Sequence, residues 1–168
     1  MPTITRGTLR RSILIATAAW IPLFAVTLLS NVVFPSEDND SPAVIALGYL
    51  AVFAVLALVG YVAARRGTDP GGLAICGVVA GAAIGLLMAA TFFFVDNVWL
   101  DIVARQPQKI AGLAESGGGS MRAYINKGLI GPTIFFPLVL AAFGAMFALA
   151  GGSIAQWHGS RGARRSAG

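Results

Sequence analysis

Residues 73–95, with the sequence LAICGVVAGAAIGLLMAATFFFV, contain no Asp, Glu, Lys, Arg or His over 23 positions. At a rise of about 1.5 Å per residue, about 20 helical residues cross the roughly 30 Å hydrocarbon core of a bilayer. Because lipid offers no hydrogen-bond partner to bare backbone groups, such a run favours a helix. The stretch therefore predicts a membrane-spanning helix.

Three further charge-free runs have the same character, at residues 13–34, 43–64 and 129–150. All 12 basic and 7 acidic residues lie between or outside the four runs. This partition matters because one charge at the centre of a spanning helix costs about 2.5–3.5 kcal/mol. We expect an all-α integral membrane protein, a single domain over residues 1–168 in which four helices form an antiparallel bundle.

The composition excludes the soluble classes. Hydrophobic residues make up 57% of the chain and charged residues 11%, whereas soluble domains carry about 25% charged residues.

The first run follows arginines and could be a secretory signal, but it is longer than the 7–15 residues of a signal core, so we expect a retained helix.

The basic residues indicate the orientation of the chain. Eight arginines fall on one side of the predicted bilayer, at positions 6, 10, 11, 65, 66, 161, 164 and 165, against Arg105, Lys109, Arg122 and Lys127 on the other. Cytoplasmic loops carry the excess of Lys and Arg. We expect both termini in the cytoplasm of a bacterial cell, with the lipid bilayer rather than nucleic acid as the partner of these charges.

The links between the runs differ in length. Residues 35–42 and 65–72 form short links, which make neighbouring helices antiparallel. Residues 96–128 form a longer external segment, for which we expect short interfacial helices, one starting at Pro107 and one capped by Ser120, separated by Gly117–Gly119. This segment is either a docking surface or a structural cap. Residues 153–168 are expected to form a disordered basic tail.

Aromatic residues flank the predicted spans. Trp99 and Tyr124 lie at the predicted outer membrane interface, and Tyr61 and Trp157 lie at the inner one. Such placement is typical of the aromatic belts of membrane proteins.

Small residues recur at four-residue spacing within the spans. Gly77, Gly81 and Gly85 predict a glycine zipper on the third helix, and Gly144, Ala148 and Gly152 form a matching row on the fourth. Such rows allow close packing inside one bundle or between two copies. We favour packing within the chain, and a second copy or another membrane protein is the alternative partner.

Prolines interrupt two of the runs. Pro22 and Pro137 each remove a backbone donor and predict a kink. Broken helices occur at transporter sites, but proline is also an ordinary feature of membrane helices.

The chain offers few groups for chemistry. His158 is the only histidine and Cys76 the only cysteine, so a metal site or a Ser-His-Asp triad cannot be assembled, and we expect neither a cofactor nor an enzyme. Asp101 and Arg105 have the spacing of a helical ion pair.

Two classes of function remain. The first is a structural or protein-interaction role, such as an accessory subunit of a membrane complex. The second is an uncoupled channel or facilitator for a small solute after oligomerisation, in which Asn31 and the hydroxyls of Thr17, Thr27, Thr91 and Thr133 would line a polar path.

Overall fold

The computed structural model describes residues 4–29, 32 and 42–166, and this part of the chain contains helices and no strand. The helices are α1 (Arg6–Leu28), α2 (Pro42–Ala64), α3 (Pro70–Val98), α4 (Leu100–Val103), α5 (Pro107–Glu115) and α6 (Met121–Ser166). Four of them, α1, α2, α3 and α6, are long and apolar enough to cross a membrane. The all-helical fold class is therefore confirmed.

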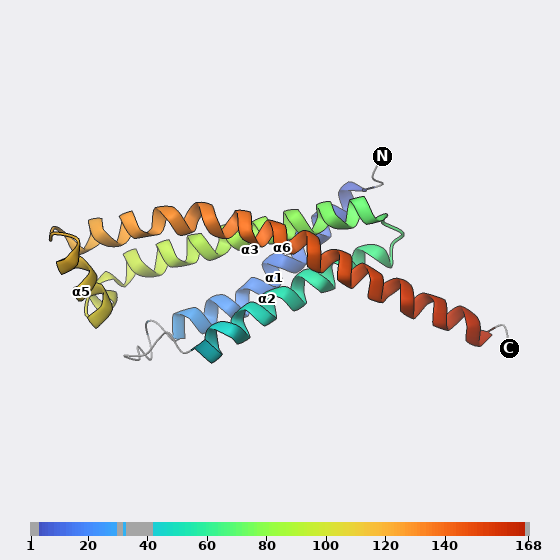
Figure 1. Cartoon of the computed structure of the whole chain (residues 1–168), viewed down its shortest axis with the longest axis horizontal. Coiled ribbons are helices and arrows are strands. Elements are labelled where there is room, and N and C mark those ends of the chain that lie inside the picture. Colours follow the sequence, from blue (N-terminus) through green and yellow to red (C-terminus); the bar gives the residue numbers. More distant parts are fainter. Residues whose placement is uncertain (1–3, 30–31, 33–41, 167–168) are drawn as a thin grey trace.

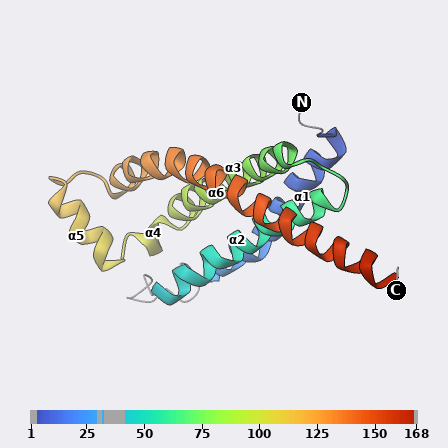
Figure 2. The same cartoon turned by 45° about the vertical axis from the view of Figure 1, so that its right-hand side comes forward.

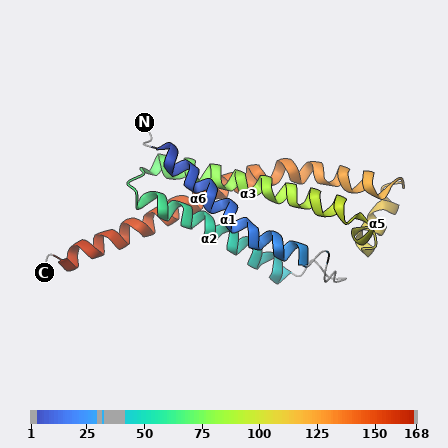
Figure 3. The same ribbon diagram turned by 180° about the vertical axis from the view of Figure 1, so that it is seen from behind.

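The four long helices are arranged as two pairs. Helix α3 shares its largest interface with α6, while α2 packs against α6 and α1 packs against α3. The α3–α6 pair and the α1–α2 pair lie together near the termini and diverge toward the end that carries α5 (Figures 1 and 2). The view from behind shows the same divergence (Figure 3).

Helix α1 begins before the first charge-free run. Thr5 precedes its first turn, and the Thr5 side chain accepts a hydrogen bond from the backbone N–H of Thr8 at 3.2 Å. A side-chain acceptor at this position satisfies one of the free N–H groups of a helix start. The helix therefore includes Arg6, Arg10 and Arg11. Asn31, the predicted end of this helix at Phe34, and residues 35–41 of the first external link fall outside the described residues. Pro42, which was expected in this link, is the first residue of α2.

The link between α2 and α3 is shorter than predicted. Gly67 adopts a φ of 78°, and Thr68 N–H donates to Ala63 C=O at 3.3 Å, so α2 ends in a glycine-terminated turn. Asp69 then accepts a hydrogen bond from Gly72 N–H at 2.7 Å, with Pro70 in the first turn of α3. Residues 70–72, with the sequence Pro-Gly-Gly, were expected in the link but form the start of a helix instead, because proline at this position loses no needed donor.

Helix α6 differs most from the prediction. Ser120 caps its start, where the Ser120 hydroxyl accepts from Ala123 N–H at 3.2 Å. From Met121 the helix continues for 46 residues, so the segment before residue 129 is not a separate interfacial helix and the tail after Gly152 is helical as far as Ser166. Packing against α2 extends the helix: Ala155 is buried, and the rings of Tyr61 and His158 lie 6.3 Å apart.

The segment between α3 and α6 folds over one end of the molecule. Helix α5 starts at Pro107 and ends before Gly117–Gly119, which all have positive φ, as the sequence indicated. Helix α4 has only 4 residues. Arg105 therefore lies beyond its end, and the predicted helical ion pair between Asp101 and Arg105 does not form.

The core lies where the four long helices meet. It contains Ala16 from α1, four residues from α2, four from α3 and Leu140 from α6 (Ala16, Val52, Leu56, Val59, Ala63, Leu73, Cys76, Ala80, Ile84, Leu140). Cys76 is a buried free cysteine within this cluster. Small and branched side chains dominate, so the backbones approach closely.

Candidate functional site

The three glycines of α3 lie against the backbone of α6. A Cβ atom at Gly81 would overlap the carbonyl oxygen of Leu140, and one at Gly85 would stand 2.6 Å from the nitrogen of Pro137. A Cβ at Gly77 would overlap the carbonyl oxygen of Gly144. Any side chain at these positions would push the two helices apart, so the contact requires glycine.

Helix α2 joins the same contact by packing against Ala148 of α6, a residue that is 0% exposed. A Cβ at Gly77 would stand 2.7 Å from Cβ of Ala148, and a Cβ at Gly60 would overlap the Ala148 carbonyl oxygen. Ala148 thus touches α3 on one side and α2 on the other. We call this set, Gly60, Gly77, Gly144 and Ala148, the three-helix junction.

Further small residues extend the α2–α6 contact beyond the junction. A Cβ at Gly151 would overlap the carbonyl oxygen of Ala57, and one at Gly152 would meet the side chain of Leu73. Gly152 belonged to the predicted row, whereas Gly151 was missed. The signal was present, since Gly151 follows Ala148 at helical spacing i+3.

The two predicted kink positions lie inside continuous helices. Pro22 is within α1, and α6 contains Pro132 as well as Pro137. In Figure 1 the second half of α6 is inclined to its first half. Pro137 also contacts Gly85, a role that the sequence alone did not indicate. The glycine makes room for the proline ring and backbone at this point of the α3–α6 interface.

One polar contact links α1 to α3 within the apolar region. Trp20 Nε1–H donates to the hydroxyl oxygen of Thr91 at 3.1 Å, and that hydroxyl donates to Leu87 C=O at 2.8 Å. Thr91 is 5% exposed. Both polar groups are satisfied, as the interior of a helix bundle requires.

The four predicted interface anchors lie in two pairs at opposite ends of the molecule. Trp99 follows α3 and packs edge-on against Phe94 at 5.7 Å, and Tyr124 lies in the first turn of α6 beside Gly112 of α5. Tyr61 lies near the end of α2, and the Trp157 ring is 5.4 Å from that of His158. Their depth in a bilayer remains a prediction.

Polar side chains connect α3, α5 and α6 at the α5 end. Lys109 and Asp96 form an ion pair at 3.9 Å. Asn97 donates to Asn126 Oδ1 at 2.9 Å, which joins α3 to α6 directly. These contacts hold α5 across the end of the α3–α6 pair.

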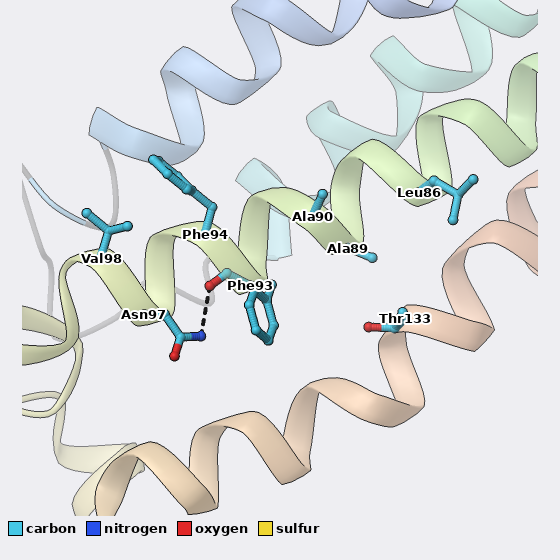
Figure 4. A pocket seen from close by; sticks show the side chains of 8 residues that line it. All are labelled: Leu86, Ala89, Ala90, Phe93, Phe94, Asn97, Val98 and Thr133. Carbon is cyan, nitrogen blue, oxygen red and sulfur yellow. Dashed lines mark hydrogen bonds between the residues drawn. The ribbon is translucent and has the colours of Figure 1, made fainter.

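Beside these contacts, residues of α3 and Thr133 of α6 line an open cleft of about 590 Å³. Figure 4 shows Phe93 and Asn97 pointing from α3 toward α6, where Thr133 faces them. Thr133 and Asn97 are the polar members of a lining that is otherwise apolar. A second cleft of about 300 Å³ adjoins it at Asn97 and Val98. The sequence did not indicate either cleft, because both depend on where α6 passes α3.

The hydroxyls considered for a polar path do not converge. Thr17 is exposed on α1 and Thr133 on α6, and the Thr133 hydroxyl donates to Leu129 C=O at 2.7 Å. Thr27 likewise donates to Leu23 C=O at 2.9 Å. Thr91 is engaged with Trp20. Each of the three bonded hydroxyls is directed toward a partner inside the protein.

Within the described part of the chain, no cluster of three or more His, Cys, Asp or Glu side chains could hold a metal ion. Comparison with protein families, with curated proteins and with solved structures finds no match to this chain. A functional proposal therefore depends on the contacts described above.

Proposed function

We propose that this chain is a multi-pass protein of a bacterial cell membrane with a structural or protein-interaction role, such as an accessory subunit. The four apolar helices would form an antiparallel bundle across the bilayer. Large apolar side chains support this proposal, since Ile21, Leu47 and Leu138 are 66%, 66% and 67% exposed. Soluble monomers rarely expose extended apolar surface, whereas lipid is a suitable environment for it.

The distribution of charge supports an orientation with both termini in the cytoplasm. The start of α1 lies at the same end of the molecule as the turn after α2, and both termini lie toward this end (Figure 1). The start of α1 carries Arg6, Arg10 and Arg11, and the turn after α2 carries Arg65 and Arg66. Helices α4 and α5 lie at the opposite end and would face outward. The excess of arginine at the first end follows the positive-inside rule.

The observation that carries the interaction role is the packed three-helix junction. Ala148 lies between the backbones of α2 and α3, and glycine lets both helices approach α6. We infer that the α3 glycines act as a zipper within the chain. A bundle closed in this way is suited to presenting a rigid surface, whereas a solute path would need polar groups that converge.

The α5 end is the surface we assign to a protein partner. It projects beyond the apolar part of α3 and α6, and Asp101, Arg105 and Glu115 are exposed there. A photoreactive amino acid at Glu115 should crosslink one protein species in intact membranes, whereas the same probe at Leu138 should label lipid. The proposal fails if both positions give the same adducts.

Reconstitution in liposomes distinguishes the proposed interaction role from the alternative function as a channel for a small solute. Purified protein in liposomes should pass small ions and polar solutes no faster than empty vesicles. A flux above that level that Thr91→Val reduces would favour the channel and contradict the interaction role.

A further inference from the structure

The two clefts at the α5 end form one continuous, amphiphilic surface. The larger cleft, lined by Leu86, Ala90, Phe93 and Thr133 among others, meets the smaller one at Asn97 and Val98. The first is apolar along most of its length. The second also contains Trp99, Asp101 and Arg122. An occupant that fills both clefts must therefore have an apolar tail and a polar head.

The polar cleft contains one negative and one positive side chain. Asp101 comes from α4 and Arg122 from the first turn of α6, and both line this cleft. Both are exposed, and the structure records no ion pair or hydrogen bond at either side chain. The two charges are therefore available to a ligand that carries both signs. A phosphate group with a nearby ammonium group has this charge pattern.

The dimensions fit one leaflet of a membrane. From Leu86 to Val98 the lining of the apolar cleft follows α3, a length of about 18 Å at the rise of an α-helix. Half of the hydrocarbon core is about 15 Å thick. Trp99, which follows Val98 and lines the polar cleft, is the type of residue that lies at the level of lipid headgroups. The volume of about 590 Å³ also lies in the range of ligand-binding clefts.

We propose that the two adjoining clefts bind one zwitterionic phospholipid of the outer leaflet. An acyl chain lies in the apolar cleft beside Phe93 and Ala90, the phosphate lies at Arg122, and the ammonium group lies at Asp101. This inference rests on the proposed membrane location and orientation. Because Asp101 also lies on the surface assigned to a protein partner, the test uses the purified chain without a partner.

The test uses native mass spectrometry of the purified full chain in detergent, after removal of lipid. Phosphatidylethanolamine and phosphatidylglycerol are titrated separately. Wild-type protein should retain one phosphatidylethanolamine and prefer it over phosphatidylglycerol. Ala90→Trp fills the apolar cleft and Arg122→Gln removes the contact to phosphate, so each should weaken phosphatidylethanolamine binding by about tenfold or more. Asp101→Asn should abolish the preference between the two lipids.

Matched variants control for general effects of these substitutions. Ala54→Trp adds the same volume on an exposed face of α2, and Arg105→Gln removes an exposed charge from the same end of the molecule without touching either cleft. Both should bind phosphatidylethanolamine as the wild type does. Equal binding by all variants, or equal affinity of the wild type for the two lipids, would overturn the proposed site.

A separate measurement distinguishes this failure from failure of the proposed function. Wild-type chain in native membranes is extracted with alkaline carbonate, which releases proteins that do not span the bilayer. If the chain stays in the membrane but Ala90→Trp binds lipid normally, only the lipid site is wrong. If the chain is released, the membrane proposal is wrong and the lipid site is rejected with it.

Discussion

Gly81 is the residue at which added volume should have the clearest effect. Its missing Cβ would overlap the carbonyl oxygen of Leu140, which is a backbone atom and cannot rotate away. We expect Gly81→Ala to lower the free energy of unfolding by about 1–3 kcal/mol, the usual cost of overpacking. Thermal unfolding in detergent measures this loss.

Gly131 provides the matched control for this substitution. It also lies within a long apolar helix, but a Cβ there would meet nothing within 4 Å. Gly131→Ala should be neutral or stabilising by up to about 1 kcal/mol, because alanine favours the helix. Equal unfolding temperatures for Gly81→Ala and Gly131→Ala would contradict the close contact between α3 and α6. If Gly81→Ala abolishes a crosslinked dimer but leaves the stability of the monomer unchanged, the glycine contact lies between two chains.

The hydrogen bond between Trp20 and Thr91 should contribute a measurable coupling between α1 and α3. Interhelical hydrogen bonds in membrane proteins contribute about 0.6 kcal/mol on average. A double-mutant cycle with Trp20→Phe and Thr91→Val should give a coupling energy of about this size. The same cycle with Thr17→Val, which changes an exposed hydroxyl of α1, should give none. A coupling that is zero in both cycles would exclude an energetic role for the bond.

At the scale of elements, the start of α3 depends on Asp69. Its carboxylate accepts the N–H of Gly72 at 2.7 Å, and loss of such a cap costs about 0.5–2 kcal/mol. Asp69→Ala should destabilise the protein by this amount and speed hydrogen exchange in the first turn of α3. Asp69→Asn should largely restore both, because asparagine also caps helices. Failure of asparagine to rescue would assign the effect to the charge of Asp69 rather than to capping.

The elements also show how far the sequence predicts the structure. Charge-free runs located the four long helices, since insertion in lipid penalises every charged side chain. Their ends were less predictable, because Thr5 and Asp69 extend α1 and α3 through capping contacts beyond the apolar runs. The continuation of α6 past Gly152 depends on its packing against α2, which no local pattern of residues reveals.

The candidate site was predicted only in part, for a similar reason. Four-residue spacing located the glycines of α3, but it could not show that Pro137 and Leu140 would be their partners. Partners depend on the axial register of two helices, which is a property of the assembled bundle. The clefts beside Asn97 depend on the same register. The spacing of small residues within one helix therefore predicts which face of that helix packs against a neighbour. Only the structure shows which residues of the neighbouring helix this face contacts.

At the scale of the whole molecule, the central claim is that the exposed apolar surface faces lipid and that the two charged ends face opposite sides of a membrane. Cysteine labelling tests both parts at once. In a Cys76→Ala background, single cysteines are placed by Arg66→Cys after α2, by Glu115→Cys in α5 and by Leu138→Cys on the exposed face of α6. All three parent side chains are exposed in the structure.

The most direct measurement is the reaction of these cysteines with a membrane-impermeant maleimide in intact cells and after permeabilisation. Glu115→Cys should react in intact cells, Arg66→Cys only after permeabilisation, and Leu138→Cys in neither case, although Leu138 is 67% exposed in the structure. Reaction of Leu138→Cys at the rate of Glu115→Cys would mean that water covers the apolar face and would contradict the membrane-spanning bundle. Reaction of Arg66→Cys in intact cells, with Glu115→Cys protected, would reverse the proposed orientation.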